Sequence, residues 1–122
     1  MPKKILVVDD EAQLVDMVKI RLEANNYLVL TAFDGQEGLE KAYKDNPDLI
    51  ILDLMLPQMD GYKVCALLKA DTRYNKIPII MFTARAQGSD IKMGEKVGAE
   101  AYITKPFEPE ELIAKIKALL KE

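Results

Sequence analysis

Short apolar runs alternate with segments of helical periodicity along the whole chain. Each apolar run is too short for a buried helix, and Asp34-Gly35 and Asn46-Pro47 mark turns between elements. Pro109 suits the first turn of a final helix, because an apolar stripe at helical spacing follows it. We predict strands at Ile5–Val8, Leu28–Ala32, Leu49–Asp53, Ile79–Thr83 and Ala101–Thr104. We predict helices at Ala12–Asn25, Gln36–Lys44, Tyr62–Lys69 and Ser89–Val97, and a last helix from Pro109.

Five strands that alternate with five helices predict an α/β fold, in which a parallel sheet is covered by helices on both faces. No linker, repeat or low-complexity segment interrupts the pattern, so we expect one domain over residues 1–122 and no output domain in this chain. Hydrophobic residues make up 49% of the chain and charged residues 30%, which is typical of a soluble globular protein. A net charge of −3 and the lack of a long apolar run argue against nucleic-acid binding and membrane insertion.

Two residue types that often carry chemistry are scarce. The chain has no histidine, which removes the usual general base, the usual zinc ligand and any serine–histidine or cysteine–histidine pair. Its one cysteine excludes an internal disulfide and is consistent with a reducing compartment. That residue, Cys65, lies among apolar residues of a predicted helix, so we expect it to pack in the core rather than act as a redox thiol.

Polar residues follow the apolar runs at the points where the predicted strands end. Because the carboxyl ends of parallel strands share one edge of a sheet, we expect these groups to meet there. Clustered carboxylates predict a site for a hard divalent cation such as Mg²⁺, which prefers oxygen ligands. Taken singly, each has an ordinary explanation as a helix-terminal acid, a capping hydroxyl or a solvated surface lysine. The residues are Asp9-Asp10 after the first strand, Asp53 after the third, Thr83 after the fourth and Lys105 after the fifth.

Four segments make a family resemblance visible. They read ILVVDDE at 5–11, PDLIILDLMLPQMDGY at 47–62, IPIIMFTA at 77–84 and GAEAYITKPF at 98–107. Together they are similar to the receiver domain of bacterial two-component response regulators, and the resemblance covers essentially the whole chain. It implies a flavodoxin-like, doubly wound fold.

The resemblance also implies roles for the acidic residues. Asp53 corresponds to the phosphoacceptor, a carboxylate nucleophile that forms an aspartyl phosphate. Asp10 and Asp53 would bind Mg²⁺ together with the backbone carbonyl of Met55, and Asp9 would hold the metal mainly through water. Lys105 would pair with the phosphoryl group.

Further roles concern the switch and its lifetime. Thr83 would form a hydrogen bond with a phosphoryl oxygen, and Tyr102 matches the switch aromatic that turns inward when the threonine moves. The bond between Lys105 and Pro106 corresponds to a cis peptide of the family. Met55 and Arg85 stand where the family tunes hydrolysis of the aspartyl phosphate. Met55 offers no hydrogen-bonding group that positions a water, and the long cationic Arg85 would cover the phosphoryl group rather than activate water.

The implied partners are a sensor histidine kinase or a histidine phosphotransfer protein, and an unknown output protein or domain. We expect a cytoplasmic domain that does not itself bind nucleic acid or membrane. Members fused to winged-helix DNA-binding domains usually carry two adjacent acids before the switch aromatic, whereas this chain has Glu100-Ala101. The segment over residues 67–80 is more similar to stand-alone receivers or to those fused to nucleotide cyclases.

Three alternatives use the same fold or chemistry. A Mg²⁺-dependent phosphohydrolase of the haloacid-dehalogenase type needs a second acid two residues after the nucleophile, and Met55 occupies that position. A flavodoxin-type cofactor binder needs a hydroxyl- and glycine-rich phosphate loop, whereas Asp9-Asp10-Glu11 would repel a phosphate. A pseudo-receiver would keep the fold without phosphorylation, and the complete set of site residues argues against it.

Overall fold

The computed structural model describes residues 2–83 and 98–122. The strands are β1 Lys4–Val8, β2 Leu28–Ala32, β3 Leu49–Asp53, β4 Ile79–Thr83 and β5 Ala101–Thr104. The helices of the described residues are α1 Ala12–Ala24, α2 Gly35–Asp45, α3 Gly61–Ala70 and α5 Pro109–Leu120. The helix predicted at 89–97 lies outside the described residues.

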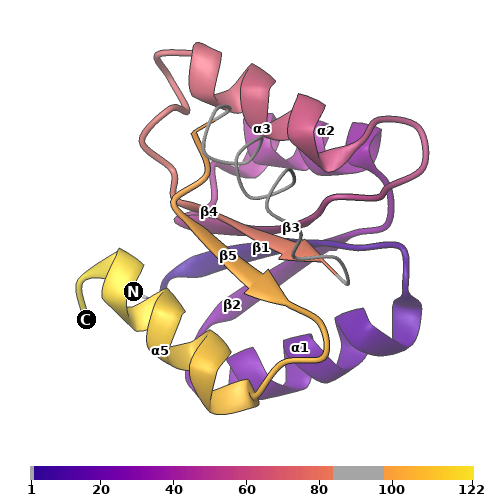
Figure 1. Cartoon of the computed structure of the whole chain (residues 1–122). Coiled ribbons are helices and arrows are strands. Elements are labelled where there is room, and N and C mark those ends of the chain that lie inside the picture. Colours follow the sequence, from indigo (N-terminus) through magenta and orange to yellow (C-terminus); the bar gives the residue numbers. More distant parts are fainter. Residues whose placement is uncertain (1, 84–97) are drawn as a thin grey trace.

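The strands form one parallel sheet in the order β2-β1-β3-β4-β5. Helices α2 and α3 cover one face of the sheet, and α1 and α5 cover the other (Figure 1). The chain therefore has the predicted doubly wound, flavodoxin-like α/β fold. Strand order reverses between β1 and β3, which places the ends of these two strands at the point where ligands bind in such sheets.

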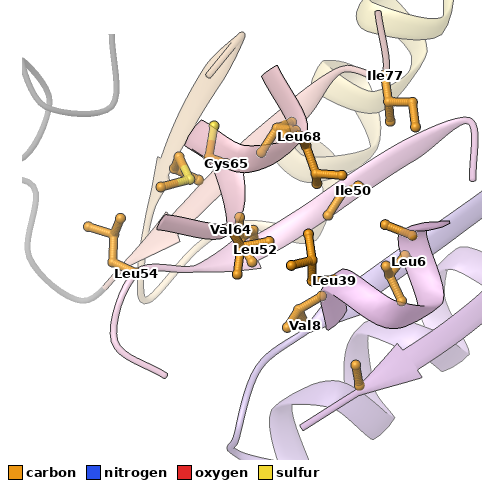
Figure 2. Close-up of a cluster of buried hydrophobic side chains, with 14 residues drawn as sticks. Leu6, Val8, Leu39, Ile50, Leu52, Leu54, Val64, Cys65, Leu68 and Ile77 are labelled. Carbon is orange, nitrogen blue, oxygen red and sulfur yellow. The ribbon is translucent and has the colours of Figure 1, made fainter. Parts of the chain in front are cut away.

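Two separate cores follow from the alternation of side chains along the strands. Leu6 and Val8 of β1 belong to the cluster beneath α2 and α3, whereas Ile5 and Val7 belong to the cluster beneath α1 and α5. Figure 2 shows Cys65 within the first cluster, where its side chain is fully buried. Burial raises the pKa of this thiol to about 11, so the core-packing prediction for Cys65 is confirmed.

Helices α2 and α3 each begin one residue earlier than predicted, at a glycine. The side chains of Asp34 and Asp60 cap these helices by accepting the N–H groups of Glu37 and Lys63. Both glycines lie against backbone. A Cβ at Gly35 would lie 1.8 Å from the Met59 carbonyl oxygen, and one at Gly61 would lie 2.1 Å from that of Asp53.

Within the described part of the chain, no helix has the length and apolar character needed to cross a membrane.

Candidate functional site

Three carboxylates meet at the carboxyl end of the sheet. Asp9 directly follows β1, and Asp53 is the last residue of β3. One oxygen from each of Asp9, Asp10 and Asp53 lies within 4.8 Å of the others. Asp9 and Asp53 are 1% and 6% exposed, whereas Asp10 is exposed. The predicted acidic cluster therefore forms, and two of its three members have been withdrawn from water.

Lys105 is surrounded by carboxylates. Its Nζ donates to Asp9 Oδ2 at 2.8 Å, to Glu11 Oε1 at 3.3 Å and to Asp53 Oδ2 at 3.5 Å. An ammonium has three protons, so these contacts occupy its full donor capacity. Burial opposes the charged form of this lysine, but its hydrogen bond to Asp9 and the charges of Asp53, Asp9 and Glu11 hold its pKa above the usual value. Lys105 is therefore a fixed cation at the site.

The nearby positive charge does not fully stabilise the ionised form of Asp53. Burial and the neighbouring charge of Asp9 raise the pKa of Asp53 to about 6. Lys105 and the Met55 N–H, which donates to Asp53 Oδ1 at 3.4 Å, oppose this shift without cancelling it. Asp9, Asp53 and Glu11 thus share the ammonium of Lys105, and with Asp10 beside them the site carries excess negative charge.

The donor set fits Mg²⁺. Carboxylate oxygens are the ligands that this ion prefers, and one or two of them usually suffice beside water and phosphate. Asp9 is already held from two sides, by Lys105 and by the Glu11 N–H at 3.0 Å from its Oδ1. The contacts to Asp53, at 3.4 and 3.5 Å, are longer than those to Asp9, and Asp10 is exposed, so Asp10 and Asp53 are the freer ligands for a cation.

The other predicted residues lie around this cluster. Thr83 is buried at the end of β4, which pairs with β3 beside Asp53. The backbone N–H of Lys105 donates to the Thr83 carbonyl at 2.6 Å, and the bond between Lys105 and Pro106 is cis, as predicted. Met55 is 64% exposed at the mouth of the site. Arg85 lies outside the described residues.

Tyr102 lies further from the charges, on β5. It is half-buried, and its hydroxyl is 3.1 Å from the hydroxyl of Tyr62 at the start of α3. We did not predict this contact, because nothing in the local sequence relates positions 62 and 102. We also did not predict the reach of Glu11 to Lys105. One signal was available: an N-cap usually has a short capping side chain, and glutamate at this position makes no cap hydrogen bond.

Comparison with known proteins gives a consistent result. The sequence model of the response regulator receiver domain matches residues 5–117. The alkaline phosphatase synthesis transcriptional regulatory protein PhoP of Bacillus subtilis is 47% identical over 121 residues, which are 99% of this chain and 50% of that protein. The chain thus spans about half the length of the curated relatives it matches.

Solved structures agree with the fold. A putative response regulator from Chloroflexus aurantiacus superimposes with a TM-score of 0.95 at 36% identity, with both chains fully covered. The receiver domain of sensor histidine kinase PA1611 from Pseudomonas aeruginosa has a TM-score of 0.92 at 27% identity, again over both whole chains. That structure contains a magnesium ion coordinated in the active site cleft.

Proposed function

The chain belongs to the response regulator receiver domain family, and from that premise we propose that it is a switch phosphorylated on Asp53. The observation that supports this most is the meeting of Asp9, Asp10 and Asp53 with Lys105 where strand order reverses. A buried carboxylate beside a fixed cation is suited to phosphoryl transfer, which depends on positioning and charge neutralisation. Family membership identifies a signalling domain, so the phosphohydrolase alternative is not carried further.

In the proposed reaction, an Asp53 oxygen attacks the phosphorus of a phosphohistidine on a partner protein. The P–O bond forms as the P–N bond to the imidazole breaks. Asp53 must be ionised to attack, and its pKa of about 6 leaves it mostly ionised near neutral pH. Lys105, now 3.5 Å from Asp53 Oδ2, would pair with the transferred phosphoryl group, and the Thr83 hydroxyl would donate to one of its oxygens.

Mg²⁺, when bound by Asp10, Asp53 and the Met55 backbone carbonyl with Asp9 acting through water, would neutralise charge on the phosphoryl oxygens. The chain's own residues prepare the site: Lys105 and the Glu11 N–H orient Asp9, and burial limits water around Asp53. The partner would be a sensor histidine kinase or phosphotransfer protein, and the domain would then act in the cytoplasm.

The response to phosphorylation is proposed for the face that contains β5 and α5; the helix predicted at 89–97, which we also expect to take part, lies outside the described residues. Thr83 and Tyr102 would change position together, because Thr83 ends β4 and Tyr102 lies two residues away in register on the neighbouring strand β5, opposite Met81. Relatives of twice this length are transcriptional regulators, which makes a DNA-binding output a candidate despite the expectation from residues 67–80. The region over residues 1–122 would be the receiver unit of such a protein.

Treatment with acetyl phosphate and Mg²⁺ tests the proposal. Intact mass should show one added phosphoryl group on the wild type and none on Asp53→Ala. Asp16→Ala, which removes an exposed aspartate of α1, is the matched control and should be modified like the wild type. A wild-type chain that stays unmodified would identify a pseudo-receiver, and equal modification of Asp53→Ala would move the nucleophile elsewhere.

The lifetime of the phosphorylated form is proposed to depend on Met55 and Arg85. The exposed Met55 thioether offers no strong hydrogen bond to a water in line with the phosphorus. Met55→Asn combined with Arg85→Ala should therefore speed loss of the phosphoryl group in excess Mg²⁺ after the donor is removed. An unchanged decay would assign the lifetime to Lys105, Thr83 and the metal.

A further inference from the structure

Glu11 contacts Lys105, the residue proposed to pair with the transferred phosphoryl group. Its side chain is 64% exposed, yet it reaches to 3.3 Å from Lys105 Nζ, which is itself 12% exposed. Its backbone is anchored at the same time, because the Glu11 N–H donates to Asp9 Oδ1 and the Glu11 carbonyl accepts the Val15 N–H. The Glu11 backbone is thus bound to a site carboxylate, and its exposed side chain contacts the site lysine.

The distances around Lys105 show where the ammonium is drawn. Asp9 lies at 2.8 Å and Glu11 at 3.3 Å, whereas Asp53 lies at 3.5 Å, the longest of the three contacts. With three protons already directed at three carboxylates, Lys105 has no donor left for an additional anion. A phosphoryl group on Asp53 can engage Lys105 only if one of these contacts is given up. Glu11 is the most exposed of the three acids and loses least by returning to water.

We propose that Glu11 is a positioning residue that holds Lys105 away from incoming phosphoryl groups and so limits phosphorylation by small free donors. This inference rests on the proposed function of Asp53. Glu11 does not touch the reacting atoms and acts through Lys105. A groove of about 370 Å³ opens beside the pair and is lined by Glu11, Lys105 and Phe107 among others, so the contact borders solvent.

Three variants separate this contact from a general effect of charge. Glu11→Gln removes the charge, and Glu11→Asp keeps the charge but is one methylene shorter and withdraws from Lys105. Asp16→Asn removes the same charge from an exposed position on α1, the helix that begins directly after Glu11. Acetyl phosphate supplies the phosphoryl group, and beryllium fluoride with Mg²⁺ supplies a phosphoryl analogue that undergoes no transfer.

We expect Glu11→Gln to raise the second-order rate constant of phosphorylation by about three- to fivefold, the size set by one exposed ion pair. Glu11→Asp should show most of this gain, and Asp16→Asn should match the wild type. Affinity for beryllium fluoride should rise in the same order, a result that a merely structural role would not produce. Thermal melts of each variant confirm that it is folded.

Other outcomes overturn the inference. If Glu11→Gln reacts and binds like the wild type, Glu11 does not withhold Lys105. If Glu11→Gln is faster but Glu11→Asp equals the wild type, the carboxylate acts by charge alone and not through the contact. If the wild type itself is not phosphorylated, the proposed function of Asp53 is wrong. That outcome differs from one in which the wild type is phosphorylated and the Glu11 variants react at the same rate, which contradicts only the role of Glu11.

Discussion

Lys69 and Lys105 have side chains that are each 12% exposed, at opposite ends of the same sheet, and their surroundings differ. Lys69 Nζ donates to the carbonyls of Asn75 and Ile77 at 3.1 and 2.8 Å and to Glu100 Oε2 at 2.6 Å. The other oxygen of Glu100 accepts the Ile79 N–H at 2.8 Å.

The network around Lys69 is balanced, with one cation, one carboxylate and neutral backbone groups. Lys105, in contrast, faces the carboxylates of Asp9, Glu11 and Asp53. The first arrangement needs nothing from outside the protein, whereas the second retains negative charge that a metal or a ligand must offset. A shortage of countercharge, rather than burial of a lysine, is what distinguishes the functional end of this sheet.

Replacing each lysine by methionine should separate the two ends most strongly. Lys105→Met should slow phosphorylation of Asp53 by about a hundredfold or more, because a preorganised charge next to the transferred group is lost. Lys69→Met should leave the rate within about twofold of the wild type, because Lys69 contacts none of the site carboxylates. Rates of modification by acetyl phosphate, measured by intact mass, decide the matter, and equal slowing in both variants would break the comparison.

The network around Lys69 should matter for stability rather than for the rate of phosphorylation. Lys69→Met should lower the free energy of unfolding by about 3 kcal/mol, because it leaves two carbonyls and Glu100 without their cation. Urea denaturation with and without Mg²⁺ should give the same loss, since the network lies far from the predicted metal ligands. A loss that Mg²⁺ repairs would contradict the separation of the two ends.

Mg²⁺ should stabilise the fold by binding the carboxylates around Lys105, and this stabilisation should not depend on the network around Lys69. At a hundred times its dissociation constant it should add about 2.7 kcal/mol to the free energy of unfolding. Thermal melts of the wild type, Asp53→Asn and Glu100→Gln test this, with the shift reduced in the first variant and retained in the second. An unshifted wild-type melt at saturating Mg²⁺ would count against the metal site.

The pKa of Asp53 makes a smaller, pH-dependent prediction for the metal-free protein. Asp53 has a pKa of about 6 in the fold against a usual 3.8, so the native state holds its proton more tightly than the unfolded state. Stability should therefore fall as pH rises from about 4 to 6 and stay low above that. Asp53→Asn should be more stable than the wild type at pH 7 by about 1 kcal/mol, and the difference should vanish near pH 4.

Melts in EDTA across this pH range measure the effect, and a variant less stable than the wild type at pH 7 would show that charge repulsion does not dominate. Asp10→Asn should give a smaller gain of the same sign, because Asp10 is exposed whereas Asp53 is buried.

Much of this architecture could be predicted from the sequence. The strands Leu28–Ala32, Leu49–Asp53, Ile79–Thr83 and Ala101–Thr104 have the predicted bounds, because short apolar runs between turn residues leave little choice. The meeting of Asp9, Asp10 and Asp53 follows from the same logic, since parallel strands deliver their ends to one edge. Backbone topology and periodicity are local or repetitive properties, and sequence patterns report them well.

Contacts made by long side chains are harder to predict from the sequence. Lys69 reads as an ordinary helix lysine, and only the path of the chain around it brings Asn75, Ile77 and Glu100 within reach. The Tyr62–Tyr102 contact joins a helix to an edge strand, and its 3.1 Å separation depends on packing between elements. The order of the distances around Lys105 likewise depends on rotamers. These features set how the site works, and they are specified by tertiary structure rather than by spacing.

The two glycines that begin α2 and α3 are hydrogen-bonded to the loop over residues 54–60, which follows Asp53. The Gly35 N–H donates to the Pro57 carbonyl at 3.2 Å, and the Gly61 N–H donates to the Leu54 carbonyl at 2.9 Å. The backbone of Met59 and of Asp53 lies directly against these glycines, so a shift of the loop is expected to disturb these hydrogen bonds. We therefore expect amide hydrogen exchange at Gly35 and Gly61 to report movement of the loop that directly follows Asp53, through two N–H groups that belong to helices α2 and α3.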